Sequence, residues 1–254
     1  MKYFGIYCKT EKSDLWKTIA NTIATLVEEA TFNATPEGFS FRAMDPSHVA
    51  LVDLNLSNAS FDKYQCDKEY QLTVRVEEFT KLIKRANQKD SVSITSDDEY
   101  LIIELKNGYK RDFKIHLIES SYSPAPVPNL SLNTHIKIKE KALQDVLSDI
   151  NVVADHIVIE AENGKVDFIG KSDLGEAVVT FEENKDEITE LEIKEKSRST
   201  YGLQYLINIV KAIGNTSEDI IMEFSDNMPL KLEFNLGEAG GKLAFYLAPR
   251  IEDN

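Results

Sequence analysis

Four histidines and two cysteines are the residues of this chain best suited to nucleophilic or metal chemistry. No two histidines have the His-x-x-His or His-x-x-x-His spacing that puts two ligands on one helical turn; they are His48, His116, His135 and His156. Cys8 and Cys66 are isolated from each other and from the histidines. Metal sites need clustered ligands, so we expect two reduced thiols and four structural or surface histidines.

Two further patterns could bind phosphate or metal. Gly237–Lys242 is similar to a phosphate-binding loop, but Leu243 stands where a Ser or Thr is needed and the spacing is short, which favours a glycine-rich hairpin. The acidic clusters at 97–99 and 182–192 could hold a metal, although acidic loops more often keep a protein soluble. No Gly-x-Ser-x-Gly occurs. The sequence therefore predicts a protein that is not an enzyme, with no catalytic residue, metal or cofactor.

Composition limits the class of protein. The chain has 254 residues, 42% hydrophobic and 28% charged, which is enough to bury a sizeable core. No run of about 18 apolar residues occurs and the first residues lack the apolar core of a signal peptide, so we expect a protein that stays inside the cell. The net charge of -14 argues against a nucleic-acid partner unless positive charge is gathered on one surface.

The first half of the chain alternates helical and strand-like patterns. An apolar stripe over 13–30 predicts a first helix, with Ser13 as N-cap. A second helix begins near Glu77 and carries Lys81, Lys84 and Arg85 on its polar side, for which a solvated surface is the simplest interpretation. Asn107-Gly108 predicts a tight hairpin. Strand-like segments are expected at 31–34, 38–43, 49–56, 70–76, 91–94, 100–105 and 111–118.

A proline-rich segment separates two similar halves. Three of the seven prolines lie within 124–128, which is typical of an extended linker. Residues 136–251 then repeat the order of the first half, helix, strands, helix, strands, and the second helix of this half is expected to end at Gly214. This repetition predicts a duplicated α+β domain.

Two segments carry a family resemblance. Residues 41–56 read FRAMDPSHVALVDLNL, with a turn predicted at Asp45-Pro46-Ser47, and residues 246–253 read YLAPRIED. In order and place, these segments resemble the DNA sliding clamp family, proliferating cell nuclear antigen, and most closely its archaeal members. The resemblance extends over the whole chain.

The resemblance implies an architecture and a function. The fold would be α+β, with two repeated clamp domains at 1–117 and 135–254, a connector at 118–134, helices lining a pore and antiparallel sheets outside. Three subunits would form a ring around double-stranded DNA, independent of its sequence, and serve as a polymerase processivity factor in DNA replication and repair. The alternatives are a non-enclosing scaffold, a checkpoint-type clamp subunit, or one subunit of a heterotrimer. The protein would be cytoplasmic in an archaeon and nuclear in a eukaryote.

The resemblance also implies which residues face DNA. Helix positions that are basic in the family would supply positive charge that the total composition hides. The third helix departs from the family, with Asp145 and Ser148 where basic residues are common, so we expect an unevenly basic pore. The DNA-facing residues would be Lys17, Lys81, Lys84, Arg85 and Lys211.

Clients of the family dock a Gln followed by an aliphatic and two aromatic residues between the connector and the C-terminal segment. Expected clients are a clamp loader, a DNA polymerase, a flap endonuclease and a DNA ligase. Core packing is the alternative role for Val49 and Leu51, and Ala125 replaces a larger aliphatic residue of the family. The matching residues are Met44, His48, Val49, Leu51, Ala125, Val127, Pro229, Tyr246, Ala248 and Pro249.

Rings of the family close by antiparallel pairing of edge strands, here 109–117 and 176–181 of neighbouring subunits. We further expect Asp145 and Asp149 to pair with Arg85 and Arg111 of the neighbour, in which case Arg85 would serve the interface rather than the pore. The interface residues would be Arg85, Tyr109, Arg111, Phe113, Asp145, Asp149, Glu176 and Val178.

Overall fold

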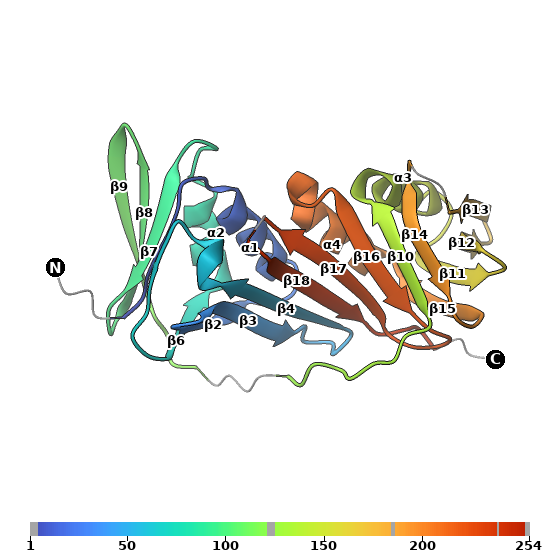
Figure 1. Cartoon of the computed structure of the whole chain (residues 1–254), viewed down its shortest axis with the longest axis horizontal. Helices are drawn as coiled ribbons and strands as arrows, with labels where there is room; N and C mark the ends of the chain where they lie inside the picture. The colour runs from blue at the N-terminus through green and yellow to red at the C-terminus, as the bar shows by residue number, and fades with distance from the viewer. Residues whose placement is uncertain (1–4, 121–124, 184–185, 238, 252–254) are drawn as a thin grey trace. The chain divides into compact units, whose positions relative to one another are not determined.

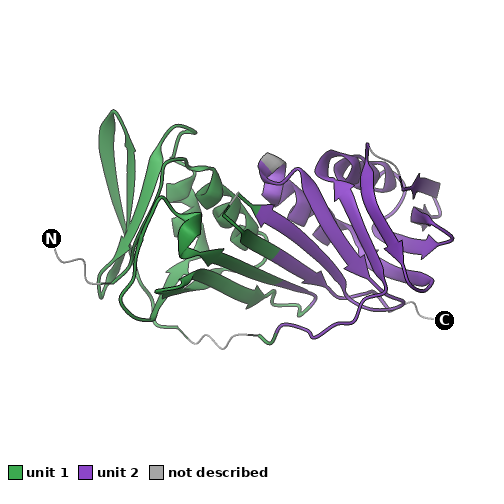
Figure 2. Ribbon diagram, viewed as in Figure 1, with its two compact units in different colours: residues 1–48, 52–126, 236–243 green, residues 49–51, 127–235, 244–254 purple. Residues whose placement is uncertain are grey.

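The computed structural model describes residues 5–120, 125–183, 186–237 and 239–251, which divide into two compact units (Figures 1 and 2). Unit 1 comprises residues 1–48, 52–126 and 236–243, and unit 2 comprises residues 49–51, 127–235 and 244–254. Some residues named above therefore lie outside the described part: Pro124 of the connector, Glu238 of the glycine-rich segment, and Glu252 and Asp253 at the C-terminus.

Unit 1 contains an antiparallel sheet in the order β5 (Lys63–Gln65), β1 (Tyr7–Thr10), β7 (Ser91–Ser96), β8 (Tyr100–Asn107) and β9 (Tyr109–His116). Burial alternates along β8, where Leu101, Ile103 and Leu105 point into the core. Gly108 connects β8 to β9 at φ 74°, which confirms the predicted hairpin. Among the described strands, β9 pairs only with β8, so it is an edge strand of this sheet, as is β5 at the other side.

A second sheet of unit 1 has the order β4 (Ala50–Ser57, of which 52–57 belong to this unit), β3 (Gly38–Met44), β2 (Glu29–Thr35) and β6 (Tyr70–Arg75), with a 3-10 turn at Asn58–Ser60 after β4. Phe32 of β2 lies opposite Phe41 of β3 and Leu72 of β6. The turn predicted at Asp45-Pro46-Ser47 is confirmed, because the His48 N–H donates to the Asp45 carbonyl at 3.0 Å.

Helices α1 (Asp14–Ala24) and α2 (Val76–Ile83) pack their apolar sides into unit 1. Trp16 is fully buried and meets Phe39 and Phe79 edge to face at centroid distances of 5.6 and 6.5 Å. The predicted first helix was too long. Leu26 and Ala30 continue its apolar pattern but follow the helix end, and β2 already begins at Glu29. Apolar spacing persisted across the boundary because both segments bury side chains in the same core.

Unit 2 also has two antiparallel sheets. One has the order β14 (Ile188–Ile193), β10 (Thr134–Lys139), β16 (Asp219–Phe224), β17 (Leu230–Leu236) and β18 (Gly241–Leu247), of which 230–235 and 244–247 belong to this unit. The other has the order β13 (Gly175–Glu182), β12 (Lys165–Ser172), β11 (His156–Glu162) and β15 (Ser197–Gly202). In the described part of the chain β13 pairs only with β12, so it is an edge strand of this sheet, as is β15.

Helices α3 (Glu140–Ile150) and α4 (Leu203–Ile213) pack their apolar sides into unit 2. A 3-10 turn at Gly214–Thr216 follows α4. Their buried residues include Leu143, Leu147, Leu206 and Val210. Gly214 takes φ 55° at the end of α4, where the sequence predicted the helix to stop. No helix in the described ranges is long and apolar enough to span a membrane.

The two units repeat one order of elements, which confirms the predicted α+β fold of two clamp-like domains. Each begins with a strand and a helix and ends with a helix followed by three strands. One expectation within the repeat was wrong: the acidic stretch 182–192 is not only a loop, since β14 occupies Ile188–Ile193 and buries Ile188. The exact domain boundaries 1–117, 118–134 and 135–254 stay a prediction.

Candidate functional site

The residue types suited to catalysis are dispersed in the structure. Within the described ranges, no three His, Cys, Asp or Glu side chains are grouped to hold a metal. His135 on β10 lies 3.4 Å from a carboxylate oxygen of Glu190 on β14 and of Glu223 on β16, the two strands that pair with β10. Burial raises the pKa of the Cys8 thiol, which disfavours the reactive thiolate. Gly237 and Gly240, at φ 74° and 78°, lie between the neighbouring strands β17 and β18, as expected for a glycine-rich hairpin.

Basic side chains lie in the last turn of α2 and directly after it. Val76, Phe79 and Ile83 are buried, which leaves Lys81 and Lys84 exposed. Lys81 donates to Glu77 one turn earlier, and this hydrogen bond lowers the pKa of the Glu77 carboxyl. Lys84 and Arg85 form no ion pair with any described residue, so their charges are available to an anion.

A groove of about 690 Å³ runs between the end of α1 and α2. Ala24 and Val27 line one side, and Thr80, Lys81 and Lys84 line the other. Acidic and basic residues complete the rim: Glu28, Glu29, Arg75, Glu77 and Glu78. Two of the predicted DNA-facing lysines thus line one concave surface of unit 1, while Lys17 lies half-buried on α1.

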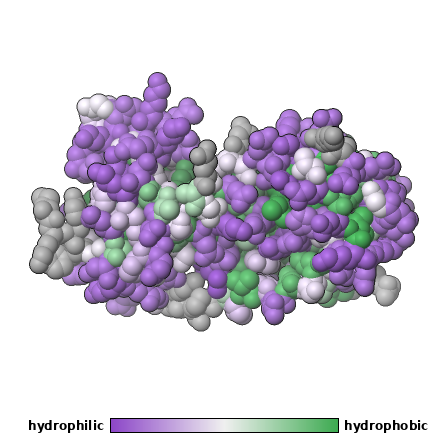
Figure 3. Space-filling model, in the orientation of Figure 1, coloured by the Kyte–Doolittle hydropathy of each residue, from purple (hydrophilic) through white to green (hydrophobic). Residues whose placement is uncertain are grey.

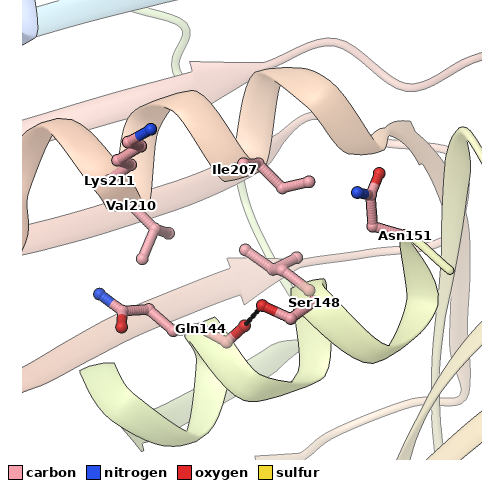
Figure 4. Close-up of a pocket in the computed structure, with 7 residues that line it drawn as sticks. Gln144, Ser148, Asn151, Ile207, Val210 and Lys211 are labelled. Carbon is pink, nitrogen blue, oxygen red and sulfur yellow. Dashed lines mark hydrogen bonds between the residues drawn. The ribbon is translucent and has the colours of Figure 1, made fainter.

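The corresponding helix pair of unit 2 has a smaller groove, of about 360 Å³ (Figure 4). Its lining residues are Gln144, Leu147, Ser148, Asn151, Ile207, Val210 and Lys211. Asp145, on the exposed side of α3, pairs with Lys141 at 2.5 Å, while Asp149 is exposed and forms no ion pair within the described chain. Lys211 is therefore the predicted DNA-facing residue of this unit, and it lies beside uncharged amides.

The edge strands β9 and β13 carry exposed apolar side chains. Tyr109 on β9 is 63% exposed and Val178 on β13 is 53% exposed. Leu174, in the turn before β13, and Val152, just after α3, are exposed as well. Hydrophilic side chains cover most of the face shown in Figure 3, so large exposed apolar residues near a strand edge are unusual for this surface.

A buried ion pair connects β9 to the end of α2. Asp90 is 1% exposed, pairs with the Arg111 guanidinium, and accepts a hydrogen bond from the Asn87 N–H at 2.7 Å. Arg111 also donates to the Arg85 carbonyl at 3.1 Å. Arg111 was predicted to pair with aspartates of a neighbouring subunit, but its guanidinium is already engaged within its own unit.

Seven of the residues predicted to bind client peptides belong to unit 2. The Ala248 N–H donates to the Val49 carbonyl at 2.8 Å, which fixes the C-terminal segment beside residues 49–51. Leu51 is only 2% exposed and belongs to the core, the role considered as its alternative. The remaining five are half-buried: Val127, Pro229, Tyr246, Ala248 and Pro249. Met44, His48 and Ala125 belong to unit 1.

Comparison with known proteins shows one family along nearly the whole chain. The profile "Proliferating cell nuclear antigen, N-terminal domain" matches residues 6–121, and the corresponding C-terminal domain matches residues 126–250. The chain belongs to the proliferating cell nuclear antigen family. This confirms the family predicted from the two sequence segments.

Relatives within the family are archaeal. The chain is 45% identical to the DNA polymerase sliding clamp of Cenarchaeum symbiosum over 96% of this chain and 97% of the relative, and 33% identical to that of Thermofilum pendens over 93% and 96%. Its fold matches the crystal structure of the proliferating cell nuclear antigen of Thermococcus kodakaraensis with a TM-score of 0.91, at 26% identity, over 96% of this chain and all of that one.

Two structural residues of this family member escaped the sequence analysis. Trp16, rather than Leu15, is the fully buried residue at the start of α1. The sequence analysis gave no role to Asp90. Asn87 and Asp90 lie at the two ends of a turn between a helix and a strand, where Asn and Asp side chains commonly accept hydrogen bonds from backbone amides. That signal could have identified the turn, but not its pairing with Arg111.

We predict that Arg111→Leu lowers the free energy of unfolding by about 3 kcal/mol, because it leaves the buried Asp90 carboxylate without its cation. Lys106→Leu on the neighbouring strand β8 is the matched control, since Lys106 is exposed and forms no ion pair with described residues; its cost should stay below about 1 kcal/mol. Urea unfolding at one fixed protein concentration measures both. Equal costs would mean that the buried pair does not stabilise unit 1.

Proposed function

We propose that this chain is the subunit of a DNA sliding clamp, a ring that encircles duplex DNA and holds a DNA polymerase on its template. The observation that carries the proposal is that the longest edge strands of the described sheets, β9 in unit 1 and β13 in unit 2, have eight residues each and carry the exposed side chains of Tyr109 and Val178, in a chain that belongs to the clamp family. Unpaired strand edges readily pair with another chain. Two different edges on one chain favour head-to-tail assembly, which closes as a ring, and the family implies three identical subunits.

The proposed mechanism is topological and has no catalytic step. A closed ring stays on DNA because it encloses the duplex, so each local contact can be weak. This accords with a chain of net charge -14 in which many of the described cations are already used in ion pairs. Replication and repair proteins would be retained on DNA through their attachment to the ring.

Burial along the edge strands limits how they can pair. Inward-facing residues must lie opposite inward-facing residues, because a one-residue shift turns every side chain to the other face of the sheet. On β9 the inward-facing residues are Arg111, Phe113 and Ile115, which lie opposite buried residues of β8. On β13 they are Ala177, Val179 and Phe181, which lie opposite buried residues of β12. Odd-numbered residues of β9 therefore pair with odd-numbered residues of β13.

Outward-facing charges limit the pairing further. β9 presents Lys110, Asp112 and Lys114, whereas β13 presents Glu176 and Glu182. We consider registers in which the two strands overlap along nearly their whole length. Those that put Asp112 opposite Glu176 or Glu182 bring two carboxylates together and are disfavoured. Two registers remain, one with Lys110 opposite Glu182 and one with Lys114 opposite Glu176. Either one sets opposite charges across the junction.

Charged side chains outside the strands would add little. Arg111 is held by Asp90 and Asp145 by Lys141, so Arg85 and Asp149 are the predicted interface charges that form no ion pair within the described chain. An exposed pair of this kind contributes about 0.2–1 kcal/mol and is screened by salt. Strand pairing and the apolar side chains of Tyr109, Phe113 and Val178 would stabilise most of the interface.

Duplex DNA would contact the helices of both units. Phosphates attract cations regardless of base sequence, which suits a ring that must slide. The proposed contacts are Lys17, Lys81, Lys84, Arg85 and Lys211, of which only Lys81 is ion-paired among the described residues. If Arg85 pairs with a neighbouring Asp149, its contribution to DNA binding falls.

Client proteins would bind the half-buried apolar residues beside the C-terminal segment. Val127, Tyr246 and Pro249 retain accessible apolar surface, and such residues commonly carry most of the energy of peptide binding. The proposed ligands are peptides with a Gln followed by an aliphatic and two aromatic residues. Clamp loader, DNA polymerase, flap endonuclease and DNA ligase are the proposed carriers of such peptides.

We predict that the protein, loaded by its clamp loader, stays on circular DNA and leaves when the circle is cut. A ring can be lost from linear DNA only through an end, so blocking both ends with a bound protein should restore retention. Gel filtration of loaded complexes before and after cleavage measures this. Equal retention on circular and open linear DNA would instead favour the non-enclosing scaffold.

We predict that cysteines at allowed outward positions cross-link neighbouring subunits. Under mild oxidation, Lys110→Cys combined with Glu182→Cys or with Thr180→Cys should give covalent oligomers up to three chains on a non-reducing gel, because these pairs lie opposite each other in the two remaining registers. Lys110→Cys with Phe181→Cys is the control and should cross-link poorly. Strongest cross-linking in the control would overturn the proposed pairing.

We predict that Val127→Asp weakens the binding of a client peptide by about tenfold or more, because a carboxylate placed against an apolar ligand loses hydration without gaining a partner. Asn129→Asp adds the same charge at an exposed position of the same segment and should leave affinity within about twofold. Fluorescence anisotropy of a labelled peptide gives both affinities. Equal affinities for the two variants would exclude Val127 from the binding surface.

A further inference from the structure

The two helix pairs differ in the charge that they offer to DNA. On α1 and at positions 84–89, just after α2, four exposed or half-buried cations form no ion pair with described residues: Lys17, Lys84, Arg85 and Lys89. Three of these follow the last turn of α2 closely, while the acidic residues Glu77 and Glu78 lie in its first turn and are paired with Lys81 and Arg75. Along α2 and the residues that follow it, the unpaired positive charge therefore lies after the last turn.

The exposed sides of α3 and α4 are almost neutral. Lys141 and Asp145 cancel each other in a pair at 2.5 Å. The remaining exposed charges on these helices are Asp149 and Lys211, which have opposite sign. The other exposed positions carry amides and a hydroxyl: Gln204, Asn208 and Ser148, with Gln204 donating to Asn208 at 2.8 Å.

The groove between α3 and α4 is likewise lined mostly by uncharged side chains. In Figure 4, Ile207 and Val210 point from α4 toward α3, and Asn151 lies at the end of α3. Ser148 donates its hydroxyl to the Gln144 carbonyl at 2.8 Å, and the Gln144 amide donates to Glu140. Among the described residues, the amide of Asn151 and the ammonium of Lys211 make no hydrogen bond, so they are the donors that this groove can offer.

We propose that the two helix pairs divide the contact with DNA: the α2 end of unit 1 attracts phosphates, and the α3–α4 surface of unit 2 contacts the duplex through neutral groups, water and Lys211 alone. This inference rests on the proposed clamp function. Charged contacts release counterions and make binding depend on salt, with a slope of about 0.9 per neutralised phosphate. Neutral and water-mediated hydrogen bonds carry no such dependence. The salt dependence of DNA binding should then arise mainly in unit 1.

A salt series with three variants tests this division. Fluorescence anisotropy of a short labelled duplex gives the binding constant of each ring, and sedimentation verifies that each variant remains assembled. Lys17→Gln/Lys84→Gln should lower the slope of log K against log salt by about 0.9 for each phosphate that the removed lysines neutralise. Gln144→Ala/Asn151→Ala should leave the slope unchanged, and Ser148→Lys, which adds a cation beside the groove, should raise it.

Three results would overturn the division while leaving the clamp intact. One is an assembled ring in which Lys211→Gln lowers the slope as much as Lys17→Gln/Lys84→Gln does. Another is an assembled wild-type ring whose binding does not depend on salt. The third is a slope that falls in Gln144→Ala/Asn151→Ala, since those residues carry no charge. Failure of the wild-type chain to assemble at all would instead count against the proposed function.

Discussion

Unpaired backbone groups along β9 and β13 are the constraint on which the proposed assembly depends. Each strand pairs on one side only, so its free N–H and C=O groups need water or another strand. Side-chain charge then selects the partner. Two copies of β9 would bring Lys110 and Lys114 toward each other, and two copies of β13 would do the same with Glu176 and Glu182, whereas β9 against β13 brings opposite signs together. The edges therefore disfavour two-fold dimers and favour head-to-tail closure.

The same distribution of charge explains how an acidic chain can hold DNA. Many cations in the described part of the chain are used in ion pairs on the sheets, such as Lys139 with Glu218 and Lys196 with Glu162. Some described cations without ion pairs lie on strands, such as Lys106 and Lys114, and others lie on the helices or just after α2. Total charge keeps the protein soluble, while a small local excess supplies attraction to phosphate. Enclosure, rather than affinity, would provide retention.

The repeated order of elements could be predicted because apolar spacing and turn residues are local signals. Asn107-Gly108 and Gly214 marked a hairpin and a helix end correctly. Local signals gave wrong predictions where contacts between distant segments determine the structure. The end of α1 was misplaced because Leu26 and Ala30 stay buried beyond it, and β14 was taken for a loop because its exposed glutamates masked its buried Ile188. Arg111 was assigned to a neighbour because sequence cannot show that Asp90 is buried beside it. The candidate surfaces came from the family resemblance. In the structure Leu51 is buried, so it does not belong to the accessible part of the surface predicted to bind client peptides.

The mass of the purified chain in solution tests the central claim most directly, because ring closure by identical subunits needs no other protein. Sedimentation equilibrium at micromolar concentration and moderate salt should give three times the 28.7 kDa mass of one chain. A mass of one chain across that range would contradict closure by self-pairing of β9 and β13. A mass of two chains would contradict the head-to-tail geometry.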